Sequence, residues 1–185
     1  MIINLMSKNI IQIRSGVDKY SNFLLYYQSM ENVKFGDYKT ELLKSGVISF
    51  VPKGNSMWPI IKNRGQSVVI KLKEERLKKY DVAFYVRKDG AFVLHRVVEV
   101  KDDGYVMCGD SQFTLEPILE EQVFGVMIGF YHGKKYIESN DTKYIKRVEK
   151  WYKRKTLRKI RLKTFFFTIR VKNKLKSIFK KLFGR

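Results

Sequence analysis

The segment Gly-Asn-Ser-Met-Trp-Pro at residues 54–59 contains a serine that could act as a nucleophile. A glycine just before Ser56 allows a tight turn that exposes the hydroxyl. Met57 can anchor this turn in a core, and Pro59 makes its exit rigid. A serine hydroxyl is a poor nucleophile until an adjacent base removes its proton, and an imidazole can do this at neutral pH. Taken alone, the segment is also typical of a surface turn with a packed methionine.

Five further motifs follow this turn. In chain order they are Tyr80-Asp81-Val82-Ala83-Phe84-Tyr85, Val93-Leu94-His95-Arg96-Val97-Val98, Gly109-Asp110, Glu116-Pro117 and Val123-Phe124-Gly125-Val126. With this order, residues 47–130 resemble the superfamily of serine peptidases that includes signal peptidase I and the self-cleaving SOS repressors. Members of that superfamily have a Ser-Met-x-Pro turn, a Gly-Asp-Val strand entry, a strand with the general base, a Gly-Asp box and a closing Val-x-Gly-x-Val strand.

The resemblance assigns roles to individual residues. His95-Arg96-Val97 looks like the His-Arg-Val box of the endoplasmic-reticulum, archaeal and sporulation-type signal peptidases, in which histidine replaces the lysine base. It implies that Ser56 is the nucleophile, that His95 is the general base and that Asp110 orients the imidazole. Glu116 falls where this branch has a second acid and is the weaker candidate. The backbone N–H of Ser56 is implied as one oxyanion donor, and Asn55 or a nearby backbone group is a candidate for the second. The neighbours expected to contact substrate are Asn55, Met57 and Pro59.

Each of these residues also has a purely structural interpretation. A lone strand histidine such as His95 is more often structural, and Gly-Asp-Ser at Asp110 is good turn chemistry. His132 fits a hairpin turn, and Cys108 fits a buried structural thiol. One Cys and two His exclude both an internal disulfide framework and a Cys/His zinc cluster. We therefore expect neither a metal nor a cofactor.

The hydrophobic pattern predicts a mainly β fold. A helical segment over residues 17–46, with a possible cap at Asp37 and a stop at Gly46, comes first. From Val47 the period changes to two, and Lys88-Asp89-Gly90 and Asp102-Asp103-Gly104 are hairpin signals. Predicted strands cover residues 48–51, 67–72, 82–87, 91–100, 105–107, 126–130 and 135–137, with a short helix or turn at 119–124. The pattern predicts a unit of coiled antiparallel strands, and the resemblance implies that it is a peptidase domain of the signal-peptidase/repressor type. We expect this domain over residues 47–138, between an N-terminal helical segment (1–46) and a basic amphipathic helical tail (139–185).

The positive charge is concentrated in that tail. The chain carries a net charge of +20, and residues 143–185 hold 18 Lys and Arg against one acid, Glu149. Val171, Leu175, Ile178, Phe179, Leu182 and Phe183 share one helical face. This pattern predicts a basic amphipathic helix lying on an anionic membrane surface. Binding to nucleic acid ranks lower, because Phe165–Phe167 and the apolar face suit lipid or a partner groove better than phosphate. An exposed tail with no specific partner is the third interpretation.

Neither a spanning segment nor a signal peptide is expected, since the apolar runs are short and interrupted by charge. We therefore expect a cytoplasmic bacterial protein, peripheral at the inner face of the membrane. The repressor interpretation is disfavoured, because no Ala precedes Ala83 and no Cys-Gly pair precedes Cys108. The predicted function is that of a serine endopeptidase that cleaves a precursor or leader peptide, with small residues preferred before the cut. The alternative is a catalytically silent module that binds membrane or nucleic acid. The oligomeric state is not predicted.

Overall fold

The computed structural model describes residues 37–62 and 65–183, so most of the helical segment predicted for residues 17–46 lies outside the described residues. Its last part is helix α3, Asp37–Ser45. Gly46 ends this helix with a φ of 74°, and its N–H donates to the carbonyl of Leu42 at 2.8 Å. The left-handed conformation favours glycine, so the helix ends at Gly46 as predicted.

Eight antiparallel strands form one sheet within the described residues. They are β1 (Val47–Phe50), β2 (Val68–Leu72), β3 (Val82–Val86), β4 (Phe92–Lys101), β5 (Gly104–Cys108), β6 (Glu116–Leu119), β7 (Val123–His132) and β8 (Lys135–Glu138), with a short 3-10 helix η2 (Glu120–Gln122). The strand order is β1-β2-β7-β3-β4-β5-β6, and β8 pairs with β7. The predicted mainly antiparallel β class is confirmed. Strand β6 was not predicted, because its sequence Glu-Pro-Ile-Leu has no clear alternation.

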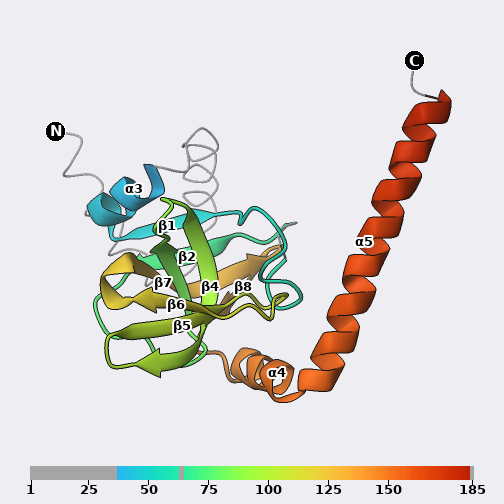
Figure 1. Ribbon diagram of the computed structural model, residues 1–185. Coiled ribbons are helices and arrows are strands. Elements are labelled where there is room, and N and C mark those ends of the chain that lie inside the picture. Colours follow the sequence, from blue (N-terminus) through green and yellow to red (C-terminus); the bar gives the residue numbers. More distant parts are fainter. Residues whose placement is uncertain (1–36, 63–64, 184–185) are drawn as a thin grey trace.

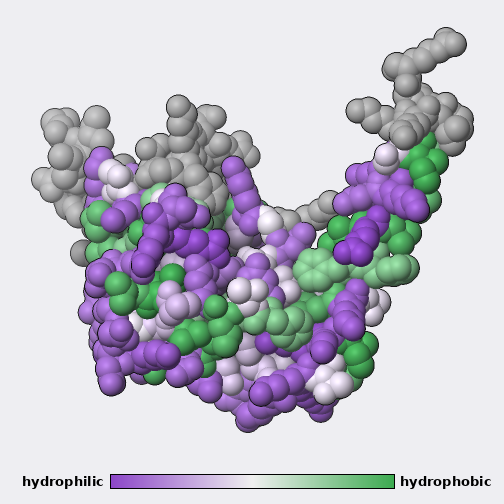
Figure 2. All heavy atoms as spheres, viewed as in Figure 1, coloured by the Kyte–Doolittle hydropathy of each residue, from purple (hydrophilic) through white to green (hydrophobic). Residues whose placement is uncertain are grey.

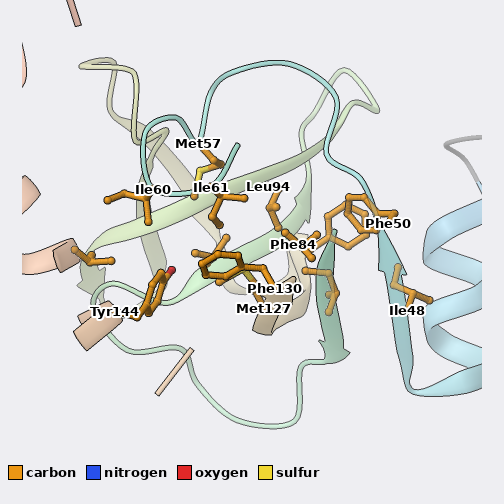
Figure 3. Packing of buried hydrophobic residues seen from close by; sticks show 14 of the residues in the cluster. Ile48, Phe50, Met57, Ile60, Ile61, Phe84, Leu94, Met127, Phe130 and Tyr144 are labelled. Carbon is orange, nitrogen blue, oxygen red and sulfur yellow. The ribbon is translucent and has the colours of Figure 1, made fainter. Parts of the chain in front are cut away.

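Side chains on the sheet and on the elements around it form the main hydrophobic core. Figure 3 shows these side chains converging from the Ser56 turn, the strands and the first C-terminal helix. Its labelled members are Ile48, Phe50, Met57, Ile60, Ile61, Phe84, Leu94, Met127, Phe130 and Tyr144. Met57 is buried among them, and this contact holds the turn that carries Ser56 on the sheet.

The C-terminal segment consists of two helices, α4 (Thr142–Lys153) and α5 (Lys155–Phe183). Asp141 caps α4 by accepting the N–H of Tyr144 at 2.8 Å. Tyr144, Val148 and Trp151 on α4 are buried in the main core. The predicted boundary at residue 139 assigns α4 to the tail, yet α4 packs as part of the β body. Figure 1 shows that α5 extends away from the body.

The length and hydropathy of the helices bear on the expected membrane location. Among residues 37–62 and 65–183, no helix is both long enough and apolar enough to cross a bilayer.

Candidate active site

The turn that carries Ser56 is held in place by backbone hydrogen bonds. Gly54 has a φ of 85°, which lets the chain reverse directly after β1. The N–H of Trp58 donates to the carbonyl of Asn55 at 3.0 Å. The loop after β5 clamps the same turn, because the N–H of Ser111 donates to the carbonyl of Ser56 at 2.8 Å and its hydroxyl donates to the carbonyl of Asn55 at 2.8 Å. The Ser56 side chain is thus on a fixed, half-buried turn.

Gly109 allows this close contact between the two loops. A Cβ atom at position 109 would lie 2.8 Å from the carbonyl oxygen of Ser56 and 2.8 Å from the side-chain oxygen of Gln112. Both distances are shorter than a carbon and an oxygen can approach without displacement. The Gly-Asp box therefore needs glycine for space, and its left-handed freedom is not used.

We expect Gly109→Ala to lower the free energy of unfolding by about 2 kcal/mol, because a methyl group would push the backbone of the Ser56 turn outward. Ser111→Ala is the matched comparison, since it removes one hydroxyl hydrogen bond without adding volume and should cost about 1 kcal/mol. Urea unfolding of both variants measures the difference. Equal stability of Gly109→Ala and the parent protein would contradict this tight packing.

His95 faces the same pocket as Ser56. It lies on β4, is 3% exposed, and lines with Ser56 a pocket of about 240 Å³. Met57, Leu94 and Gln112 also line this pocket. The structure therefore brings together the nucleophile and the base proposed from the sequence, although 39 positions separate them.

A tyrosine and a glutamate contact the Nδ1 side of the imidazole. The Tyr85 hydroxyl lies 3.2 Å from Nδ1 of His95 and donates to Oε2 of Glu116 at 2.8 Å. Because that proton is given to Glu116, the Tyr85 oxygen is left to accept the Nδ1–H of His95. Oε2 of Glu116 lies 3.7 Å from Nδ1, and Arg87 holds this carboxylate through its Nε and, at 2.7 Å, its second nitrogen. This arrangement favours the tautomer whose Nε2 can accept a proton.

Burial and charge act in opposite directions on the groups in this cluster. Burial lowers the pKa of His95 to about 4, and the attraction of the Glu116 carboxylate offsets this only in part. For Glu116, burial raises the pKa, but the hydrogen bonds from Arg87 and Tyr85 outweigh it and hold the pKa below its ordinary value. Burial, together with the Glu116 contact, raises the pKa of Tyr85. At neutral pH the cluster therefore contains a neutral imidazole and an ionised carboxylate.

Asp110 lies elsewhere and has different partners from those expected. It is fully buried, and its two carboxylate oxygens accept from Arg96 at 2.8 Å and 2.7 Å. The Tyr152 hydroxyl donates to the same carboxylate at 2.8 Å, and the indole of Trp151 donates to the Asp110 carbonyl at 2.9 Å. The acid at the imidazole of His95 is thus Glu116, the weaker candidate from the sequence. Asp110 instead joins β4 to α4.

The three residues expected to contact substrate lie in different places. Met57 lines the pocket with Ser56 and His95. Pro59 lines a separate groove against α4 and α5, and the Asn55 carbonyl is used within the turn. Sequence reasoning did not identify Tyr85, Arg87 or Gln112. Tyr85 is two residues from Ala83, which pairs with His95, so it shares the face of His95; this would be predictable only once the strand register is known.

His132 and Cys108 have structural contacts. The His132 ring contacts the side chain of Gln66, and Cys108 is buried with its pKa raised by burial. In the part of the chain that the structure describes, no group of His, Cys, Asp and Glu side chains could hold a metal ion.

Comparison with known proteins finds no matching family model, no matching curated protein and no matching solved structure.

Proposed function

We propose that this protein is a serine endopeptidase of the signal-peptidase type, with Ser56 as nucleophile, His95 as general base and Glu116 as the acid that acts on the base through Tyr85. The observation that carries this proposal is the shared pocket. Ser56 and His95 line it together, while Nδ1 of His95 is occupied by Tyr85 and Glu116. A nucleophile and its base must share one site, and an orienting acid must lie on the far side of the base.

The proposed reaction uses only groups of the chain and water. Oγ of Ser56 attacks the carbonyl carbon of the scissile bond and gives its proton to Nε2 of His95. The imidazolium is stabilised by Glu116, and it then protonates the leaving amine as the peptide C–N bond breaks. Water, deprotonated by His95, hydrolyses the acyl-Ser56 ester and restores the free hydroxyl. Among the described turn hydrogen bonds, the N–H of Ser56 donates to none, which leaves it for the oxyanion.

The pocket has apolar walls and also basic ones, from Lys53, Lys62 and Arg87. Phe50, Phe84 and Leu94 provide apolar walls, and the volume of about 240 Å³ is modest. A pocket of this volume selects by fit, which favours a small side chain beside the cleaved bond. This supports the preference for small residues that the motif resemblance implies, in a precursor or leader peptide.

Tyr80 gives independent support to the resemblance. Its φ is 79°, in the left-handed region that favours glycine. Signal peptidases have glycine at the start of the Gly-Asp-Val strand entry that Tyr80-Asp81-Val82 resembles. The backbone conformation at this position is thus the one expected for that motif, even though the side chain differs.

Labelling by a serine-directed acylating probe, with peptide mapping of the product, tests the proposal. We expect the label on Ser56. The general base must be neutral, so a pKa of about 4 for His95 means that the labelling rate rises near pH 4 and is flat from about pH 5 to 9. With an unshifted imidazole, the labelling rate would instead rise at about pH 6.5. Absence of labelling in a folded protein would contradict the peptidase and favour a silent binding module.

We expect Glu116→Gln to slow acylation of Ser56 by about tenfold to a hundredfold, because the imidazolium in the transition state loses its carboxylate. The same change should move the acid limb of the rate profile to lower pH, since Glu116 raises the pKa of His95. Glu120→Gln is the matched control, because it makes the same change at a glutamate that also forms ion pairs, with Lys73 and Arg76, but away from His95. Rates of the two variants within twofold would contradict a role for Glu116.

A further inference from the structure

Helix α5 has two faces with different surroundings. Arg158 and Leu162 are buried against the body, and the half-buried Phe165 ring stacks on Trp58 with centroids 3.8 Å apart. A second set of residues, separated by three, four or seven positions, lies along another face of the helix. This set, called the α5 stripe, is Leu157, Ile160, Phe167, Val171, Leu175 and Ile178. All six are exposed, up to 66% for Phe167.

The stripe is bordered by positive charge along its whole length. Helix α5 contains 11 Lys and Arg and no acid. Lys163 and Lys174 lie on one side of the stripe in a helical projection, and Arg161 and Lys172 lie on the other. Figure 2 shows hydrophobic surface on α5 directly beside strongly hydrophilic side chains. A helix with an apolar stripe between two basic borders suits the interface of a membrane with negatively charged lipids.

A basic groove of about 700 Å³ adjoins the first turns of the stripe. It is lined by Trp58 and Pro59 from the Ser56 turn and by Leu157 and Ile160 of the stripe. Its cations are Lys62, Arg147, Lys150, Arg154, Arg158 and Arg161. No ion pair joins any of them to an acid within the described residues. Two of them also bind backbone carbonyls: Arg147 donates to Pro59 at 2.9 Å, and Arg158, which is 7% exposed, donates to Gly109 at 3.2 Å and to Gln112. The Nε of Arg158 is buried without a hydrogen-bond partner among the described residues.

We propose that the basic groove and the α5 stripe together bind the surface of a membrane rich in anionic lipid. The groove takes the phosphate groups of lipid headgroups, and the stripe inserts into the boundary with the acyl chains. Trp58 in the groove supports this, since indole rings favour that boundary. Because Trp58 follows Ser56 by two residues and stacks on Phe165, the bound membrane lies next to the Ser56 turn.

The charge on α5 argues against two other occupants. A second copy of the chain would bring two helices with 11 bases each into contact, which like-charge repulsion disfavours. Nucleic acid would satisfy the cations but would leave the six apolar residues of the stripe exposed to water. An anionic lipid surface satisfies both features at once.

Vesicle co-sedimentation of the full chain tests this proposal. The vesicles are phosphatidylcholine alone, or phosphatidylcholine with about 30% phosphatidylglycerol. We expect binding to the anionic vesicles to be at least about tenfold tighter than to the neutral ones. The stripe variant Phe167→Ser/Val171→Ser/Leu175→Ser and the groove variant Lys150→Glu/Arg154→Glu/Arg161→Glu should each weaken it by about tenfold or more. All six side chains are exposed, so circular dichroism should be unchanged.

The matched control is Lys88→Glu/Lys134→Glu/Lys135→Glu, which makes the same charge change at exposed hairpin positions. We expect it to bind anionic vesicles within about twofold of the parent protein. If the control and the groove variant lose the same affinity for anionic vesicles, the groove does not bind the lipid headgroups specifically. Parent-level vesicle binding by the stripe variant would contradict insertion of the stripe into a membrane. So would tighter binding to a DNA duplex than to the vesicles, if the stripe substitutions leave the DNA binding unchanged. Ser56→Ala should bind vesicles like the parent, so this result is separate from the peptidase proposal.

Discussion

Replacing His95 with alanine is expected to slow acylation of Ser56 by about 10⁴-fold, and replacing Ser56 with alanine is expected to abolish it. The pocket that Ser56 lines has one described imidazole, that of His95, and Lys53 and Lys62 also line it. Removing the ring takes away the base for the attack and the acid for the leaving amine in one step. The measurement is the pseudo-first-order rate of labelling at pH 7 by the acylating probe.

His132→Ala is the matched control for this prediction. His132 is the other histidine of the chain, and its ring contacts Gln66 at the far end of β7. We expect this variant to be labelled at the parent rate. The double variant Ser56→Ala/His95→Ala should show no further loss beyond Ser56→Ala, because the two groups act as a unit. Labelling of His95→Ala at the parent rate would show that the serine reacts without this base, and would remove His95 from the mechanism.

The sequence predicted the scaffold well because its signals are local. Period-two alternation, the Lys88-Asp89-Gly90 turn and the stop at Gly46 each depend on a few neighbouring residues. The strand that escaped prediction, β6, is short and contains Pro117. Local signals also explain why α4 was assigned to the tail: it is rich in basic residues like the rest of the C-terminal segment. Its Tyr144, Val148 and Trp151 are nevertheless buried in the core. Their spacing predicts a buried face only when the sheet that covers it is known.

The candidate site was predictable in part. Ser56 and His95 are marked by a turn motif and a strand motif, and the structure places both at one pocket. The choice between Asp110 and Glu116 could not be made from the sequence, since it depends on sheet register. Met107 of β5 pairs with Glu116 of β6, which places Glu116 on the face that carries His95 and Tyr85. Cys108, one residue before the Gly-Asp box, pairs with Arg96, and this brings Asp110 toward the Arg96 side.

Asp110→Ala is expected to lower the free energy of unfolding by about 3 to 5 kcal/mol. The guanidinium of Arg96 is fully buried, and it would lose both of its bonds to the Asp110 carboxylate. A guanidinium is not deprotonated in proteins, so the variant cannot remove this buried charge at neutral pH. Tyr152 would lose its acceptor as well, which loosens α4. The measurement is the urea concentration at half unfolding.

The double variant Arg96→Met/Asp110→Ala separates a structural role from a catalytic one. Removing both partners leaves no buried charge, so it should be more stable than Asp110→Ala by about 2 kcal/mol or more. If Asp110→Ala does not fold and the double variant does, this also shows that Asp110 is needed to neutralise the buried charge of Arg96. We expect the double variant to label Ser56 within about tenfold of the parent rate, because Glu116 and Tyr85 still hold His95. A stable double variant with about a 10⁴-fold slower rate would instead return Asp110 to the catalytic group.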